Sequence, residues 1–342
     1  MSRERAIVTG GAGFIGSAVV DRLVRAGTEV LVIDDLSRGC TSNLERAFAE
    51  GARLEALDIR DGAALTKEFA SFRPDYVFHL AGQIDVRTSM FDPALDASIN
   101  VIGAVNVFVA AMASGVRRIV NTSTGGAIYG EASVVPTSEA ARPNPTSAYG
   151  LSKRAAELYA RWFARAGGLD VLTLRYGNVY GPRQNPAGDA GVVAIFCDRL
   201  LAGLPITVYG DGKQTRDYIY VADIATANLA AARIRRPRCR EFNIGTGIEI
   251  TILALVDTIE AIAGAHLPKV QVCFAAPRPG DLRRSCLDVS RARRELGLRL
   301  TTPLETGLAE TIAWFAWRRD RLSRDDANVR GDNVSAAAPG IA

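Results

Sequence analysis

Thr9-Gly10-Gly11-Ala12-Gly13-Phe14-Ile15-Gly16 is the stretch of sequence that decides the fold. It follows a short apolar run, Arg5–Thr9, and leads into a segment with helical spacing, Phe14–Ala26. Gly10 permits a tight turn, Gly13 lets backbone N–H groups approach a pyrophosphate, and Gly16 lets the helix pack closely on the sheet. The helix N-terminus adds a partial positive charge. The stretch therefore predicts a dinucleotide-binding loop, with cofactor contacts from Gly10, Gly13, Phe14, Ile15 and Gly16.

An acidic pair, Asp34-Asp35, follows the next apolar run, Glu29–Ile33, and begins eighteen residues after Gly16. These carboxylates can accept hydrogen bonds from the adenosine ribose hydroxyls and would repel a 2′-phosphate. The pair therefore favours NAD over NADP, and Ser37-Arg38 is the only nearby feature that points the other way. An ordinary strand-to-helix turn, with Asp34 as a solvated cap, is the alternative interpretation.

Six apolar runs without polar alternation look like strands buried on both faces of a sheet. They are Arg5–Thr9, Glu29–Ile33, Leu54–Ile59, Tyr76–Leu80, Arg118–Thr122 and Val171–Leu174. The helical segments between them are Phe14–Ala26, Gly62–Ser71, Pro93–Ser114 and Ala148–Ala166. Parallel strands need crossover connections, which are right-handed. We therefore predict an α/β fold with a Rossmann-type, doubly wound parallel sheet.

The regular alternation ends near Asn178, where proline and glycine become frequent. Beyond it we predict helices at Val192–Ala202, Val221–Ile234 and Ile252–Ala263, and strands at Ile206–Tyr209 and Glu241–Ile244. We divide the chain into an NAD-binding domain, 3–177, to which 222–247 returns, and a smaller, partly interleaved C-terminal substrate lobe, 178–221 and 248–320. Residues 321–342 have little to bury and are expected to be disordered.

The composition excludes several classes of function. The 342 residues carry 41 Lys+Arg against 37 Asp+Glu, and no long basic run marks a nucleic-acid arm. The five cysteines form no CxxC pair and only His79 and His266 exist, so we expect neither disulfides nor a metal site. Apolar stretches such as Val101–Ala113 are interrupted well before the roughly 20 residues of a bilayer span. With no signal peptide before the first strand, we expect a cytoplasmic protein without membrane or nucleic-acid partners.

Two further predicted strand ends fall beside the expected cofactor. Asp58-Ile59 can line an adenine pocket, although a carboxylate that caps the next helix is an equal alternative. Leu80-Ala81-Gly82 ends the fourth run with small residues suited to a nearby ligand. His79, at the end of an apolar run, is predicted to be a hydrogen-bonded structural histidine.

Tyr149 and Lys153 open a predicted helix at a spacing that places the phenol and the ammonium on one face. A phenol has an ordinary pKa of about 10, so it needs a neighbouring cation, helped by an oxidised nicotinamide, to act as a base near neutrality. The fifth run continues into Ser123-Thr124-Gly125-Gly126, where a hydroxyl can hold the reacting oxygen of a substrate. Alone this Tyr/Lys pair is a common surface pair; beside a cofactor loop it predicts a proton-handling site.

Six motifs occur in order: TGGAGFIG at Thr9–Gly16, HLAGQ at His79–Gln83, STGGAIYG at Ser123–Gly130, YGLSK at Tyr149–Lys153, NVYGPRQ at Asn178–Gln184 and RDYIYVADI at Arg216–Ile224. Together they resemble the extended short-chain dehydrogenase/reductases, and within them the bacterial UDP-glucose 4-epimerases. The resemblance covers the chain from about Arg5 to Arg318.

The resemblance implies NAD-dependent epimerisation at C4 of a UDP-hexose, UDP-glucose or UDP-galactose, through a transient 4-keto sugar. Tyr149 would be the base, and Lys153 would lower its pKa and hold the nicotinamide ribose. Many relatives have a third Ser where this chain has Gly125, so the hydroxyl partner is Thr124 or Ser123, and we favour Thr124.

The resemblance also implies cofactor contacts from Asn100 and Tyr176, and a homodimer formed through Pro93–Ser114 and Ala148–Ala166. On the second lobe it implies contacts with the UDP-sugar from Asn178, Val192, Val193, Arg216, Arg278 and Asp281. Arginine suits a diphosphate because its planar fork can donate twice. An ion pair with neighbouring Asp217 is the alternative role of Arg216.

Ser285 occupies a position where some relatives carry tyrosine, and its small side chain predicts that UDP-GlcNAc and UDP-GalNAc also fit. Dehydratases of the family usually place an Asp-Glu pair where this chain has Gly125-Gly126, which argues against dehydration. A UDP-uronic acid epimerase or decarboxylase stays open, because an extra arginine for the carboxylate could come from Arg87, Arg183 or Arg284. A non-catalytic, NAD-sensing protein is the third alternative.

Overall fold

Seven strands form one parallel sheet in the order β11-β6-β5-β4-β1-β2-β3. The computed structural model describes residues 3–187, 191–264, 271–278, 280–299 and 302–335, without the side chains of 322–335. The strands are β1 (Arg5–Thr9), β2 (Glu29–Asp34), β3 (Arg53–Ala56), β4 (Tyr76–His79), β5 (Arg118–Thr124), β6 (Val171–Tyr176) and β11 (Glu241–Ile244). The predicted α/β fold with a doubly wound parallel sheet is confirmed.

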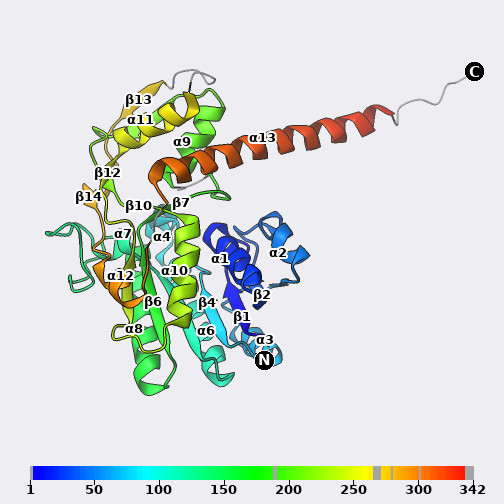
Figure 1. The fold of residues 1–342 in the computed structure, drawn as a ribbon, viewed down its shortest axis with the longest axis vertical. Helices are drawn as coiled ribbons and strands as arrows, with labels where there is room; N and C mark the ends of the chain where they lie inside the picture. Colours follow the sequence, from blue (N-terminus) through cyan, green and yellow to red (C-terminus); the bar gives the residue numbers. More distant parts are fainter. Residues whose placement is uncertain (1–2, 188–190, 265–270, 279, 300–301, 336–342) are drawn as a thin grey trace, which may run out of the picture.

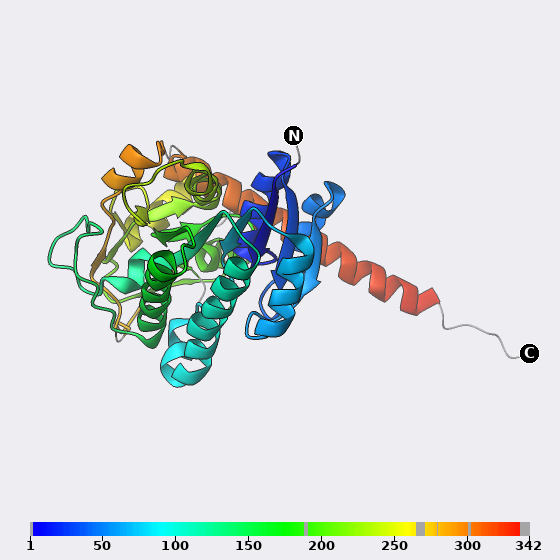
Figure 2. The same cartoon turned by 90° about the horizontal axis from the view of Figure 1, so that it is seen from below.

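Helices cover both faces of this sheet. α1 (Phe14–Arg25) and α10 (Val221–Arg233) lie side by side on one face (Figure 1). α3 (Gly62–Phe72), α6 (Ala104–Ala113) and α8 (Ala148–Ala166) cover the other face (Figure 2). α10 and β11 come late in the chain. The sheet is therefore completed only after the first segment of the second lobe, 178–221.

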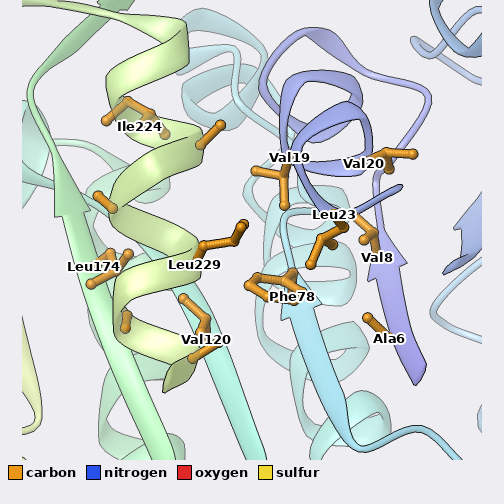
Figure 3. Close-up of a cluster of buried hydrophobic side chains, with 14 of the residues drawn as sticks. Ala6, Val8, Val19, Val20, Leu23, Phe78, Val120, Leu174, Ile224 and Leu229 are labelled. Carbon is orange, nitrogen blue, oxygen red and sulfur yellow. The ribbon is translucent and has the colours of Figure 1, made fainter. Parts of the chain in front are cut away.

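Successive side chains of a strand point to opposite faces of the sheet, so the layers between the sheet and its two sets of helices contain different side chains. On β1, Val8 points into the layer of α1 and α10, whereas Ile7 points into the layer of α3 and α6. In the first layer, Leu23 of α1 and Leu229 of α10 approach each other above Phe78 of β4 (Figure 3). Both layers are therefore apolar, which fixes the position of α1 and of the loop before it.

The third predicted strand differs from expectation. We predicted a run buried on both faces over Leu54–Ile59, whereas β3 ends at Ala56 and its residues are exposed or half-buried. The reason is its place in the sheet, because β3 is an edge strand that pairs only with β2.

The predicted helix Pro93–Ser114 forms as α5 (Pro93–Ala97), a π-helical segment (Ser98–Gly103) and α6. Contrary to the interruption argument, Pro93–Ala113 is long and apolar enough by length and composition to span a bilayer. A core helix passes the same test, and here Val107 and Phe108 are fully buried against the sheet. The π-helical segment places Asn100 behind the carboxyl end of β4, which is common for such segments near functional sites.

The second lobe packs α9 (Val192–Leu201), α11 (Ile252–Ala263) and α13 (Leu304–Ser335) around a separate core that includes Phe196, Leu255 and Phe315. Its short strands are β7 (Asn178–Tyr180), β8 (Ile206–Tyr209), β9 (Thr215–Arg216), β10 (Tyr218–Tyr220), β12 (Ile250–Thr251), β13 (Val272–Ala275) and β14 (Arg284–Ser285). They form three small sheets, β10-β7, β12-β9-β14 and β13-β8.

The six short strands β7, β9, β10, β12, β13 and β14, the helix α13 and five short helices of the described residues were not predicted, and the short elements offer too few residues for a periodic pattern. The five short helices are η1 (Thr41–Leu44), α2 (Glu45–Ala49), α4 (Val86–Phe91), α7 (Gly125–Ile128) and α12 (Ser290–Glu295). The end of the chain also differs, since α13 continues to Ser335 through part of the tail 321–342 that we expected to be disordered. Helix formation is cooperative, so residues that follow a packed helix can extend it. Residues 336–342 lie outside the described residues.

Candidate active site

A cavity of about 1660 Å³ lies at the carboxyl ends of β1, β2, β4, β5 and β6, where open α/β sheets bind ligands. All predicted cofactor and catalytic residues line it except Asn100, and so do Asn178, Val192 and Val193. Arg216, Arg278, Asp281 and Ser285 lie outside its wall. The fold thus gathers the cofactor loop and the proton-handling residues in one cavity.

The glycine loop has the close approaches that the sequence predicts. Gly10 has a φ of +70°, and a Cβ there would lie 2.5 Å from the backbone nitrogen of Ala81. A Cβ on Gly16 would overlap the carbonyl oxygen of Gly10. Gly13 is the N-cap of α1 and provides no side chain to cap it, so the first N–H groups of α1, at the cavity wall, are available to an anion. These residues fit the diphosphate of NAD.

Asp34 supports this loop from the end of β2. Its two carboxylate oxygens accept hydrogen bonds from the backbone N–H groups of Ala12 and Leu36, each at 2.9 Å. Burial raises the pKa of Asp34, and the two backbone hydrogen bonds oppose that effect. Arg38, the residue that pointed toward NADP, lies 3.8 Å from the carboxylate of Asp85. The negative charge at the cavity wall is therefore suited to ribose hydroxyls.

The alternatives at two other strand ends are resolved. Asp58 does not cap the next helix: Asp61 caps α3 by accepting from the Ala64 N–H at 2.9 Å, while Asp58 pairs with Arg60. His79 is the structural histidine that we predicted, because its Nδ1 hydrogen-bonds with Thr9 Oγ1 at 2.8 Å. Burial lowers the pKa of His79 to about 3, so it stays neutral.

Tyr149, Thr124 and Lys153 meet where α8 approaches the end of β5. Ser147 caps α8 by accepting from the Gly150 N–H at 3.1 Å, which places Tyr149 in the first turn. The phenol of Tyr149 hydrogen-bonds with the Thr124 hydroxyl. Lys153 Nζ donates to the carbonyl oxygen of Thr122 at 3.3 Å. The hydroxyl of Ser123 is buried without a hydrogen-bond partner among the described residues, whereas Thr124 is the hydroxyl that interacts with the phenol.

Burial dominates the electrostatics of Tyr149 and Lys153. Burial raises the pKa of Tyr149 to about 12, and the hydrogen bond from Thr124 only partly opposes it. Burial also lowers the pKa of Lys153 to about 8. In the protein alone, loss of water is the largest effect on both groups, and the lowering of the phenol's pKa by Lys153 together with an oxidised nicotinamide stays a prediction.

Two of the implied cofactor residues have structural partners. Asn100 lies behind Gly82, where its amide donates to the Gln83 carbonyl at 2.9 Å and to Asp96 Oδ1 at 3.0 Å. Tyr176 lines the cavity, and its hydroxyl accepts from Asn228 Nδ2 at 2.7 Å. Asn100 thus stabilises the loop after β4 and does not itself line the cavity.

The four residues outside the wall cluster on the small β12-β9-β14 sheet and the loop before it. Arg216 pairs with Asp281 and donates to the Leu282 carbonyl at 2.8 Å. The alternative pair with Asp217 is wrong, because the buried Asp217 carboxylate accepts the Thr246 N–H at 2.7 Å instead. The Arg278 guanidinium lies over the Tyr209 ring, 3.9 Å from its centre, and Ser285 pairs with Arg216 across the strands.

The sequence interpretation missed Gln184 and Tyr218. Both line the cavity, and the Gln184 Oε1 and Tyr218 hydroxyl oxygens are buried without a partner among the described residues. Buried polar atoms without partners are unusual and mark groups that await a ligand or water. Each belongs to a quoted motif, NVYGPRQ or RDYIYVADI, and those motifs were the available signal.

Comparison with known proteins agrees with this geometry. Residues 6–245 match the model of the NAD dependent epimerase/dehydratase family. The chain is 45% identical to a UDP-glucose 4-epimerase of Mycolicibacterium smegmatis over 91% of this chain and 98% of that protein. Among solved structures, it superposes on UDP-glucose 4-epimerase with UDP-glucose from Thermotoga maritima with a TM-score of 0.87, at 44% identity over 92% of this chain and 99% of that one. The Thermus thermophilus UDP-glucose 4-epimerase complex with NAD gives a TM-score of 0.84, at 40% identity over 91% of this chain and 99% of that one.

The chain therefore belongs to the NAD dependent epimerase/dehydratase family. It is an NAD-dependent enzyme of the epimerase type, and its similarity to UDP-glucose 4-epimerases extends through both lobes.

Proposed function

We propose that this protein interconverts UDP-glucose and UDP-galactose by inverting the configuration at C4 of the hexose. The observation that carries the proposal is that Thr124, Tyr149 and Lys153 meet on the wall of the cavity that the glycine loop also lines. A proton-transfer group beside a dinucleotide loop is what reversible oxidation of a secondary alcohol requires.

Each of these residues has a defined task in that reaction. Tyr149 takes the proton of the sugar 4-hydroxyl and returns it after the transient 4-keto sugar has turned over in the cavity. The Thr124 hydroxyl, already bonded to the phenol, holds the same sugar oxygen in line. Lys153 is an ammonium below a pH of about 8 and favours the phenolate while it is charged. Bound NAD supplies the hydride acceptor and the positive ring charge that helps to ionise the phenol.

The two lobes divide binding. The segments 3–177 and 222–247 hold the cofactor, and 178–221 and 248–320 hold the nucleotide sugar. The diphosphate of the UDP-sugar is assigned to Arg216 and Arg278, which lie beyond the cavity wall on the second lobe. Gln184 and Tyr218, with buried atoms free of partners in the described structure, are further polar contacts for the sugar nucleotide.

The geometry disfavours the related reactions. This chain has no acid for dehydration at 125 or 126, and a Cβ on Gly125 would lie 2.5 Å from Leu287 Cδ1, so a side chain there requires Leu287 to move. For a uronic acid, Arg284 is paired with Glu249 at 2.9 Å and Arg183 with Asp21 at 2.9 Å. Arg183 and Arg284 are thus each paired with a carboxylate of this chain.

A homodimer is part of the proposal. Exposed apolar side chains gather on the two helices that the resemblance implied, with Ile102 and Met112 on one and Leu151, Leu158 and Trp162 on α8. Their exposed fractions run from 43% to 61%, and an apolar patch of this kind on neighbouring helices marks an association surface. We also propose a cytoplasmic location, because all five cysteines are free thiols, as in a reducing compartment.

The test is to mix purified protein with UDP-galactose and to look for UDP-glucose. Product formed without added NAD supports an epimerase whose cofactor is regenerated in each turnover. Cofactor binding without product from UDP-galactose would instead support the NAD-sensing alternative, and product only from UDP-glucuronic acid would support the uronic acid alternative.

A further inference from the structure

Asp96 on α5 is a buried carboxylate that the proposed reaction does not use. Its side chain is 1% exposed. One oxygen, Oδ1, accepts from Asn100 Nδ2 at 3.0 Å and from Gln83 Nε2 at 3.2 Å. The other oxygen, Oδ2, is buried without a hydrogen-bond partner among the described residues. An ionised carboxylate in such a place is costly unless a positive charge is near.

Lys153 carries a positive charge on α8, which packs against α5, and Asp96 acts on it. Asn100 links Asp96 to this helix, since the same amide donates to Ser152 Oγ at 3.2 Å, and Ser152 directly precedes Lys153. Within the described part of the chain, no arginine or lysine forms an ion pair with Asp96. Its charge therefore acts on Lys153 and Tyr149 across the short space between the two helices.

Two other carboxylates face this region, and both have partners of their own. Glu157 lies one turn beyond Lys153 on α8, where Arg175 Nε and Nη2 contact its two oxygens at 2.8 and 2.7 Å. Asp85, before α4, caps that helix by accepting from the Thr88 N–H at 2.8 Å and faces Arg38. Asp96 is thus the carboxylate near the catalytic pair whose charge is least balanced by its neighbours.

We propose that Asp96 is a positioning residue whose buried negative charge keeps Lys153 in its ammonium form beside Tyr149. This inference rests on the proposed function, since it assigns Asp96 a part in the same proton transfer. Asp96 lies outside the cavity wall and touches neither substrate nor cofactor, so it acts through Lys153.

The sign of the effect follows from the charges. Burial lowers the pKa of Lys153 to about 8, and Asp96 opposes that lowering. Asp96 also adds to the raised pKa of Tyr149. Removing the negative charge therefore lowers both pKa values. Lys153 would then lose its proton nearer neutrality, and the phenol would ionise at lower pH.

The experiment compares the holoenzyme with Asp96→Asn, which keeps the shape, and Asp96→Ala, which does not. The dependence of kcat on pH is measured for each, together with the tyrosinate absorbance that Tyr149→Phe removes. We expect both limbs of the kcat profile and the tyrosinate titration to move to lower pH by about one unit in both variants. Asp92→Asn is the matched control, because Asp92 is a half-buried carboxylate that caps the same helix from the position before it, and asparagine can cap as well.

The inference is overturned if either variant folds and its kcat is lower at every pH while the pH dependence of kcat is unshifted. That result would show that Asp96 has only a structural role. A shift equal to that of Asp92→Asn would do the same. Failure of the proposed function looks different, because the unaltered protein would then give no UDP-glucose from UDP-galactose. The tyrosinate titration still reports on Asp96 in that case.

Discussion

Lys153 of α8 donates a hydrogen bond to the backbone carbonyl of Thr122 on β5, across 3.3 Å. Thr122 lies two residues before Thr124, whose hydroxyl bonds the phenol of Tyr149. The ammonium and the phenol, one helical turn apart, are thus both tied to the same strand end. This double attachment fixes the base relative to the cofactor loop, and positioning of this kind accounts for a large part of catalysis.

Tyr149→Phe should lower turnover by roughly 10²-fold or more, because the proton of the 4-hydroxyl loses its acceptor. The NAD content should be unchanged, since phenylalanine keeps the ring. Turnover of UDP-galactose and the NAD released on denaturation are the two measurements. Unchanged turnover would remove Tyr149 from its role as the base.

Gly16→Ala should abolish retention of NAD and lower the thermal stability, because the new methyl group overlaps the Gly10 carbonyl oxygen. Gly13→Ala is the matched control. Its methyl group meets only the Gly10 oxygen at 3.2 Å, at an extended φ of −77°, so the fold should survive while NAD retention falls. Normal NAD content in both variants would contradict the assignment of this loop to the diphosphate.

Arg216→Lys should raise the KM for UDP-galactose by about tenfold with little change in NAD content, since only a guanidinium can stay bonded to Asp281 and the Leu282 carbonyl and still offer further N–H groups to a diphosphate. Arg283→Lys provides the comparison, because Arg283 is an exposed neighbour paired with Asp211. If the two variants show equal KM values, Arg216 does not bind the diphosphate.

Ser285→Tyr should decrease turnover of UDP-GlcNAc and UDP-GalNAc while activity on UDP-glucose remains, if position 285, which lies outside the cavity wall, borders the bound sugar as the resemblance implies. A phenol ring there would take the space of an N-acetyl group. The ratio of kcat/KM for acetylated and plain sugars is the quantity to follow. Complete failure of the unaltered protein on both acetylated sugars would refute the broader specificity.

Trp162→Arg should convert the proposed dimer to monomers, because it places a charge among the exposed apolar side chains of α8. Light scattering gives the mass directly. Trp317→Arg is the control, as Trp317 is similarly exposed, 54% against 58%, but lies on α13. If Trp317→Arg causes dissociation and Trp162→Arg does not, the interface between subunits lies on another face of the molecule.

Much of the site could be predicted from the sequence because its residues belong to local motifs. The glycine loop, Asp34 and the Tyr149/Lys153 spacing can each be recognised from neighbours within a few residues. A parallel sheet, once predicted, implies that the corresponding strand ends lie along one edge. Prediction was less successful where burial decides the chemistry. Burial raises the pKa of Tyr149 in the protein alone, because the fold removes water from the phenol, and the spacing of Tyr149 and Lys153 gives no sign of this.

The sequence by itself determined the dinucleotide loop, the alternation of strands and helices and the identity of the proton-handling residues, because these follow from short-range spacing and side-chain chemistry. Only the tertiary structure decided that Arg216 pairs with Asp281 rather than with adjacent Asp217, and that Thr124 rather than Ser123 contacts Tyr149. It also placed Asp96 against α8. The physical reason is that ion pairing, burial and hydrogen bonding act through space, between residues whose separation along the chain carries no signal.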